Sequence, residues 1–204
     1  MDENLLLELS NYAGLASAVV LTINFFLGML LATAYKTNRY WKKIPVKLQQ
    51  MDVNNIHNYT AYIAWVLVLL HVLFLLFDKT SKFTLIDVLF PLNAPSQNLF
   101  VAFGTLSLYA ITVVIITTQK VIKRKMSFRA WKNIHLISYG TAILFVLHGI
   151  FMDPHLKNGQ PDFFDGEKLL LEFCGLLLVV ASVIRYRYYL KKSLATHETR
   201  LFIK

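Results

Sequence analysis

The 204-residue chain is too apolar for an ordinary soluble domain, since 56% of its residues are hydrophobic and only 16% are charged. A typical soluble domain is about a quarter charged. The formal net charge of +9 does not indicate a nucleic-acid interface, because the basic residues lie between apolar stretches and not along a polar face. A single cysteine, Cys174, excludes an internal disulfide and argues against a cysteine-based metal or iron–sulfur site.

The N-terminus reads Met1-Asp2-Glu3-Asn4, which is acidic where a secretory signal peptide is basic. We therefore expect the first apolar stretch to be retained as an anchor. Five stretches approach the roughly twenty apolar residues that a bilayer core requires. They cover about 11–34, 55–77, 99–118, 131–152 and 169–190. The sequence thus predicts an all-α integral membrane protein, a bundle of five transmembrane helices that forms a single membrane domain over residues 1–204.

The segments between these spans alternate in charge. One set, which holds 17 basic and 2 acidic residues, comprises 35–54, 119–132 and the tail from 185. The other set, which holds 4 basic and 10 acidic residues, comprises 1–10, 78–98 and 152–172. Because basic loops remain in the cytoplasm, we expect the N-terminus outside and the C-terminus in the cytoplasm.

The outer segment 78–98 is only partly polar. Residues 83–90 are apolar enough to lie in the membrane interface as a short helix or a re-entrant piece. Pro91 and Pro95 should end this piece before the third span begins.

Four of the six histidines lie in the second and fourth spans. His57 and His71 are fourteen positions apart, and His135 and His148 are thirteen apart. At about 1.5 Å per residue, each pair is separated by roughly 20 Å along its helix. Both spans run from the cytoplasm outward, so the depths match as an inner pair, His57 with His135, and an outer pair, His71 with His148. Four imidazoles at two depths are what two bis-histidine haems stacked across a membrane require.

An ionisable residue inside a span is usually functional, although such histidines can also serve only as hydrogen-bonding partners between helices. Small residues that would make room for a macrocycle are Ala61, Ala64, Gly140 and Gly149. A thirteen-residue separation falls about 140° short of four full helical turns. Helix tilt, different imidazole rotamers or a local distortion near Tyr139-Gly140 would have to absorb this difference.

Haem propionates require cationic partners at each face. The candidates inside are Arg39, Lys42, Lys43, Arg129 and Lys132, and the weaker ones outside are Lys79, Lys82 and Lys157. His155 and His197 lie in polar segments and are interpreted as ordinary solvated residues. The chain has no Cys-x-x-Cys-His motif, so any haem would be bound non-covalently as haem b.

These motifs, His57-x₁₃-His71 and Trp131-x₃-His135-x₁₂-His148-Gly149, resemble the ferric reductase-like transmembrane family. That family includes the membrane cores of NADPH oxidases and ferric reductases, and the haem-binding subunit of the periplasmic methionine-sulfoxide reductase. Thr117-Thr118-Gln119 before a basic turn is most similar to the last of these. Two complete pairs are more similar to the oxidases and ferric reductases. The resemblance covers roughly residues 11–190, with one span fewer than the six usual in the family.

The resemblance implies electron transfer across the membrane through two haems b, from the inner pair to the outer pair and on to an outside acceptor. In the oxidases and ferric reductases the donor is a flavin domain after the last span. Here only 17 residues follow Arg187, and no Gly-x-Gly-x-x-Gly motif occurs. We therefore expect a separate cytoplasmic flavoprotein, or quinol from the bilayer, to supply electrons to this component of an oxidoreductase in a bacterial inner membrane.

Two other interpretations remain open at this point. The chain can be a haem-binding membrane subunit dedicated to one periplasmic oxidoreductase, in which case it should co-purify with that enzyme. It can also be a haem-free scaffold or transporter subunit with structural histidines. Transporters more often show charged or unwound helices at the midplane, and the sequence offers none.

Overall fold

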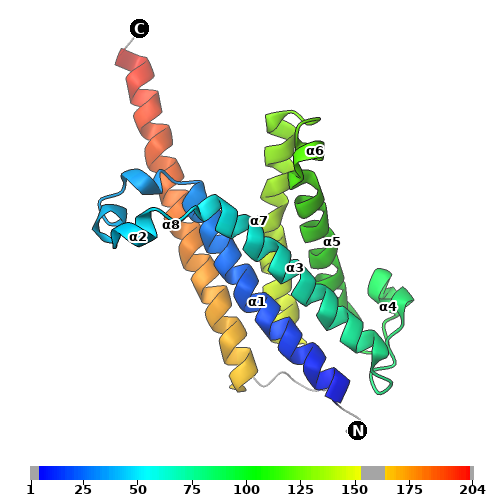
Figure 1. The fold of residues 1–204 in the computed structure, drawn as a ribbon. Coiled ribbons are helices and arrows are strands. Elements are labelled where there is room, and N and C mark those ends of the chain that lie inside the picture. Colours follow the sequence, from blue (N-terminus) through cyan, green and yellow to red (C-terminus); the bar gives the residue numbers. More distant parts are fainter. Residues whose placement is uncertain (1–4, 153–163, 203–204) are drawn as a thin grey trace.

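A computed structural model of the protein describes residues 5–152 and 164–202, and every element in this part of the chain is a helix (Figure 1). The long helices are α1 (Leu5–Leu31), α3 (Val53–Phe77), α5 (Asn98–Thr118), α7 (Phe128–Phe151) and α8 (Gly166–Phe202). The short ones are η1 (Tyr35–Thr37), η2 (Trp41–Lys43), α2 (Val46–Gln49), α4 (Leu85–Leu89), η3 (Pro91–Asn93) and α6 (Lys120–Lys123).

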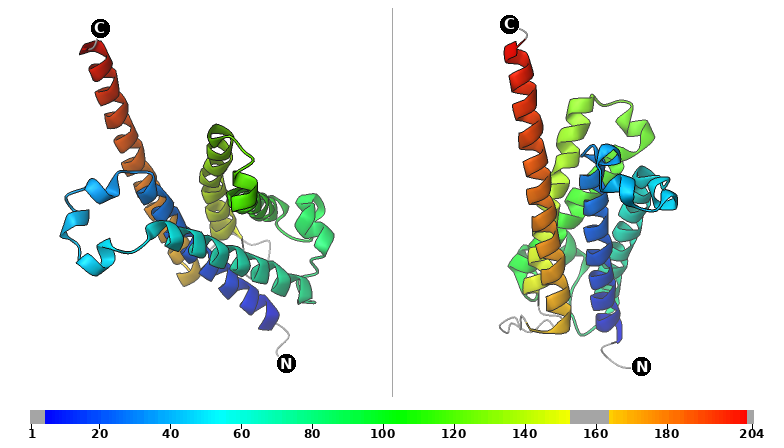
Figure 2. Two further views of the ribbon diagram at one scale, coloured as in Figure 1. Left: turned by 45° about the horizontal axis from the view of Figure 1, so that its top comes forward. Right: turned by 90° about the vertical axis from the view of Figure 1, so that its left-hand side faces the viewer.

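The predicted all-α membrane fold is confirmed, because five helices of the described chain are long and apolar enough to cross a membrane. α1 begins at Leu5 and not near residue 11, since Leu5, Leu6 and Leu7 extend the apolar run toward the N-terminus. α8 also continues past residue 190 as a helix, and Figure 2 shows it rising beyond the other helices. The chain is an integral membrane protein.

Polar residues at the expected positions fix where the spans begin. The Asp52 side chain accepts hydrogen bonds from the backbone N–H groups of Asn54 and Asn55 at the start of α3. Ser127 accepts from the N–H of Ala130 at the start of α7. Such caps satisfy donors that have no partner within the helix. These caps hold the two histidine-bearing helices in defined register with the segments before them.

The bundle consists of two packed helix pairs and a fifth helix. α1 packs along α3, α5 packs along α7, and α8 lies against both α1 and α7 (Figures 1 and 2). α1 and α5 run in one direction along the bundle, and α3 and α7 run in the opposite direction. In the described part of the chain, α3 and α7, which carry the histidines, do not pack closely along each other as α1 and α3 do. Long side chains must therefore bridge the space between them.

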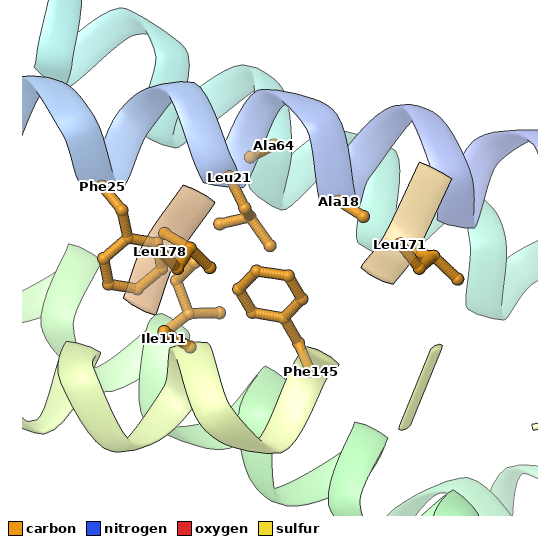
Figure 3. Packing of buried hydrophobic residues seen from close by; sticks show 9 residues of the cluster. Ala18, Leu21, Phe25, Ala64, Ile111, Phe145, Leu171 and Leu178 are labelled. Atoms are coloured by element: carbon orange, nitrogen blue, oxygen red, sulfur yellow. The ribbon is translucent and has the colours of Figure 1, made fainter. Parts of the chain in front are cut away.

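An apolar cluster fills the middle of the bundle. α1 contributes Ala18, Leu21 and Phe25, and the other helices contribute Ala64, Ile111, Ala142, Phe145, Leu171 and Leu178. The Phe25 and Phe145 rings stack with centroids 6.2 Å apart (Figure 3). Close packing of this kind drives helix association in lipid, where the hydrophobic effect between helices is weak. This cluster holds α1 and α7 at a fixed distance.

The segment 78–98 forms the short helix that its sequence predicts, α4. Thr84 and Asp87 make a capping box at its start. The segment is fastened to α5, because the Thr105 hydroxyl donates to the Val88 carbonyl at 2.9 Å and the Tyr109 hydroxyl to that of Leu89 at 2.7 Å. Apolar side chains on its outward side are exposed: Leu85, Ile86, Phe90 and Leu92. Its position at the membrane interface stays a prediction.

Candidate functional site

The four intramembrane histidines meet in two facing pairs. The ring centroids of His57 and His135 are 6.1 Å apart, with their planes at 72°. Those of His71 and His148 are 6.3 Å apart, with their planes at 74°. The structure thus brings together the partners that matching depth predicts. We call them the His57 site (His57 and His135) and the His71 site (His71 and His148).

Three of the four imidazoles have a defined tautomer. The Nδ1 atom lies 3.1 Å from the Asn24 carbonyl oxygen in His57, 2.8 Å from that of Ser10 in His71, and 2.7 Å from that of Phe100 in His148. A carbonyl oxygen only accepts hydrogen bonds, so Nδ1 carries the hydrogen in each ring. The Nε2 atom is then left with its lone pair, as metal-binding histidines require.

Glycines on neighbouring helices make room for the same three rings. A Cβ added at Gly14 would lie 3.1 Å from Nδ1 of His71, and one at Gly28 would lie 3.1 Å from Cε1 of His57. At Gly104 it would lie 2.8 Å from Cε1 of His148. The small residues expected to give space, such as Gly140, are on the ligand helices. A Cβ added at Gly140 would have no described atom within 4 Å, so its part in making room for a macrocycle stays a prediction.

His135 is supported in a different way. Its ring stacks on Trp131, one turn earlier in α7, with centroids 5.2 Å apart and planes at 22°. The Lys123 ammonium lies 3.8 Å from the centre of the Trp131 ring. Both Nδ1 of His135 and Nε1 of Trp131 are buried and have no hydrogen-bond partner within residues 5–152 and 164–202. The His57 site therefore contains one ligand fixed by a carbonyl and one fixed by stacking.

This difference also bears on the thirteen-residue separation of the α7 histidines. α7 is an uninterrupted α-helix through Tyr139-Gly140, so no local distortion rotates its second half. Instead, the two rings rest on different supports, His148 against Gly104 of α5 and His135 against Trp131 of its own helix. The side chains, and not the backbone, absorb the difference in direction.

A large cavity lies between the His71 site and the surrounding helices. It is partly open to the surroundings, and both His71 and His148 line it. Its wall includes Lys168, which is only 4% exposed. The Lys168 ammonium donates to the backbone carbonyls of Gly149, at 3.0 Å, and Met152 at the end of α7. A buried cation thus stands beside the C-terminal end of α7.

The cationic partners that the sequence predicts lie on the surface where the structure describes them. Arg39, Arg129 and Lys132 are exposed, and so are Lys42, Lys43, Lys79 and Lys82. Arg39 donates to the Tyr40 hydroxyl at 2.8 Å and its guanidinium lies over that ring. Lys157 and His155 fall outside the described residues, and His197 lies in α8. No hydrophobicity pattern identifies Lys168, but its place just inside the start of the last span was a signal that sequence reasoning missed.

The facing rings fit a flat macrocyclic metal group. An imidazole nitrogen lies about 2 Å from a bound first-row metal, so two rings on opposite faces of one ion have centroids roughly 6 Å apart. Both observed separations agree with this value. No group of three or more His, Cys, Asp or Glu side chains occurs among the described residues. Haem iron needs only two axial protein ligands, since its macrocycle supplies the other nitrogens.

Fold and site together define a helical membrane protein with two facing histidine pairs in its interior. The protein-family model described as ferric reductase like transmembrane component matches residues 13–146 of this chain. That range contains three of the four histidines. The chain belongs to this family, whose members commonly bind haem. The comparisons with curated proteins and with solved structures gave no match. Family membership suggests a membrane electron-transfer component.

Proposed function

We propose that the chain is a di-haem b-type membrane cytochrome that carries electrons across the bilayer. The observation that carries this proposal is the separation of the imidazole centroids in both pairs, 6.1 and 6.3 Å, each close to that of two axial ligands of one iron. His57 and His135 would hold one haem, and His71 and His148 the other. When bound, each haem supplies the one-electron chemistry of its iron.

The protein's own part is to fix the ligands and to keep water away from them. Carbonyls at Ser10, Asn24 and Phe100 accept the Nδ1 hydrogens, which directs the Nε2 lone pairs away from those helices. Such hydrogen bonds also raise the basicity of the ligand. The apolar cluster around Phe25 and Phe145 separates the two sites. This arrangement supports two discrete sites in one bundle.

The charges at the two ends predict the orientation of the chain, and the family resemblance implies the direction of transfer. Basic residues dominate the end that holds the His57 site, including Lys123, Arg129 and Lys132. By the positive-inside rule this end faces the cytoplasm. Electrons would enter at the His57 site and leave from the His71 site to an acceptor outside. The donor would be a separate cytoplasmic flavoprotein or quinol, in a bacterial inner membrane.

Cations near each site are candidates to pair with haem propionates. Arg39, Arg129 and Lys132 are the predicted partners at the cytoplasmic end. Their exposed side chains are long enough to reach a carboxylate at the membrane surface. Lys168 is the candidate for the His71 site, because it lines the cavity there.

The test is a dithionite-reduced minus oxidised absorption spectrum of the detergent-purified chain, with extracted haem counted per chain. We expect a b-type spectrum and about two haems, as two bis-histidine sites require. The variants His71→Leu and His148→Leu should each remove the same haem, and His57→Leu and His135→Leu the other. The matched control is His197→Ala, which lies outside both pairs.

Other outcomes would point to the alternatives. A chain that binds no haem when expressed with adequate haem supply would contradict the proposal and favour a scaffold with structural histidines. One haem, together with co-purification of one soluble oxidoreductase, would favour a subunit dedicated to that enzyme. Reconstitution into vesicles with a trapped reductant then measures whether electrons reach an oxidant on the other side.

A further inference from the structure

Helix α1 contacts the two histidines of α3 through one arrangement that it uses twice. Ser10 contacts His71, and Asn24, fourteen residues further along α1, contacts His57, which precedes His71 by fourteen. The backbone carbonyl of each α1 residue accepts the Nδ1 hydrogen of its histidine. The α1 side chain then donates back to the backbone carbonyl of the same histidine, at 2.9 Å from Ser10 Oγ and 2.5 Å from Asn24 Nδ2.

A glycine completes each contact four residues later. Gly14 lies against the His71 ring and Gly28 against the His57 ring. Positions i and i+4 share one face of a helix, so the carbonyl and the space for the ring face the same way. The unit is thus a small polar residue, three intervening residues and a glycine. The antiparallel helices keep both units in register because their contact residues have the same fourteen-residue separation.

Helix α5 has this unit in partial form at one histidine and lacks it at the other. The Phe100 carbonyl and Gly104 hold His148, without a side-chain donor. Thirteen residues further along α5, where the register of α5 against α7 reaches His135, stands Thr117 in place of glycine. The Thr117 hydroxyl donates to the Val113 carbonyl at 2.8 Å. Val113 is thirteen residues after Phe100, so this carbonyl is the counterpart of the one that accepts from His148.

His135 shows the effect directly, since its Nδ1 has no hydrogen-bond partner among the described residues. Neighbouring helices therefore hold three of the histidines, and for His57 and His71 they contact both the ring and the backbone. His135 is instead stacked on Trp131 of its own helix. The asymmetry is a property of the neighbouring helices and not of the histidine spacing.

We propose that α1 is a duplicated clamp in which Ser10 positions His71 and Asn24 positions His57, each for its own haem. The inference rests on the proposed function. Each side chain ties the backbone of a ligand to the residue whose carbonyl orients its ring, so the imidazole plane and its hydrogen bond are fixed together. Removal of one side chain loosens one ligand and leaves the other site unchanged, because the two units share no residue.

The test uses the full chain in nanodiscs and measures haem retention, the midpoint potential and the low-spin ferric EPR signal of each site. Steeply inclined imidazole planes give strongly anisotropic low-spin signals, so rotation of one ring moves the signal of one haem. Asn24→Leu should alter only the His57 site, and Ser10→Ala only the His71 site. Loss of such outer-shell contacts typically costs about 10–100-fold in metal affinity, and we expect about tenfold here because the carbonyls remain.

Conservative exchange provides the rescue. Asn24→Ser copies the unit of the other site, and Ser10→Thr keeps the hydroxyl at a position that is only 1% exposed, so both should restore most of the signal that Asn24→Leu and Ser10→Ala lose. The matched control is Thr22→Ala, since Thr22 is buried on α1 but its hydroxyl bonds only to the Ala18 carbonyl of its own helix at 2.8 Å. It should move neither signal.

Two results would overturn the clamp. Both sites changing together in each variant would show a general structural role of α1, and neither site changing would show that the carbonyls suffice. If Asn24→Leu does not accumulate, Asn24→Ala and Ser10→Ala give the same comparison. A wild-type chain without haem would instead refute the proposed function, and the clamp with it, so the two failures are distinguishable.

Discussion

Gly104 lies directly against His148. A Cβ atom at position 104 would come within 2.8 Å of Cε1 and 2.9 Å of Nδ1 of the imidazole. The same Nδ1 atom lies 2.7 Å from the Phe100 carbonyl oxygen, one turn earlier on α5. The ring is therefore pressed against the backbone of α5, at a distance that only a residue without a side chain permits.

We expect Gly104→Ala to displace His148 and to remove haem from the His71 site. Because the added carbon overlaps the ring, the ligand must rotate and lose its carbonyl contact, with a loss of about 10–100-fold in haem affinity. The measurement is haem per chain together with the reduced minus oxidised spectrum. Gly166→Ala is the matched control, since nothing lies within 4 Å of a Cβ there and Gly166 is not among the residues expected to make room for a macrocycle. An unchanged spectrum in Gly104→Ala would contradict the role of this glycine.

Replacement of Lys168 by methionine should lower the midpoint potential of the His71 site. Lys168 and His148 line the same cavity, and removal of a nearby cation favours the ferric state with its extra positive charge. The two carbonyls of Gly149 and Met152 also lose a charged donor. We expect a loss of about 1–3 kcal/mol in the free energy of unfolding.

A spectroelectrochemical titration measures the midpoint potential of the His71 site. Lys168→Arg keeps the positive charge and should leave this potential close to that of the native chain. Lys47→Met serves as the control, because Lys47 is an exposed lysine of α2 that is not among the predicted propionate partners. Surface replacements of this kind change stability by no more than about 0.5 kcal/mol. If Lys47→Met and Lys168→Met lower the potential equally, the effect is one of net charge and not of the buried ammonium.

Trp131→Leu should disturb the His57 site alone. The stacked rings of Trp131 and His135 contribute about 0.5–1.5 kcal/mol beyond their burial, and Trp131 is the support of a ring whose Nδ1 has no partner. We expect a broadened EPR signal from the His57 site, which Trp131→Phe largely restores. Trp41→Leu, whose ring packs edge-on against Tyr35, should leave both signals unchanged.

The stability of α4 should depend on pH through Asp87. The Thr84 hydroxyl, and after it the Thr84 backbone N–H, holds the pKa of the Asp87 carboxyl below its ordinary value. Because the pKa of Asp87 is lower in the folded state, its ionised carboxylate stabilises α4. This stabilisation is complete above the unfolded-state pKa of about 4. It is lost as the pH falls through the lower pKa of the folded state. Protection of the α4 amides against hydrogen exchange, corrected for intrinsic rates, should therefore be equal at pH 7 and pH 6 and fall near pH 3.

The replacement Asp87→Asn isolates this contribution. The neutral side chain does not titrate, so the protection of α4 should be lower at pH 7 and should no longer change between pH 7 and pH 3. If Asp87→Asn and the native chain lose protection in parallel on acidification, another group controls α4.

Much of the fold could be predicted from the sequence, because its signals are local. Runs of apolar residues defined all five spans, and errors at the ends arose where Leu5 and the polar part of α8 continue a helix past the apolar run. The pairing of His57 with His135 and of His71 with His148 could be predicted from their positions along the two spans. Spans that cross the same bilayer in the same direction place residues with similar positions at similar depths. The described structure brings these pairs together.

The supports of the histidines required the tertiary structure. Ser10 and Asn24 have the same fourteen-residue separation as His71 and His57, but the coincidence has meaning only once α1 is known to run antiparallel to α3 in that register. Burial of Lys168 and the stacking of Trp131 on His135 likewise depend on which helix faces which. The sequence by itself determined which residues lie at which depth in the membrane. Only the packing of the helices decided which carbonyl and which glycine meets each imidazole, because a hydrogen bond or a Cβ contact changes within a few tenths of an ångström.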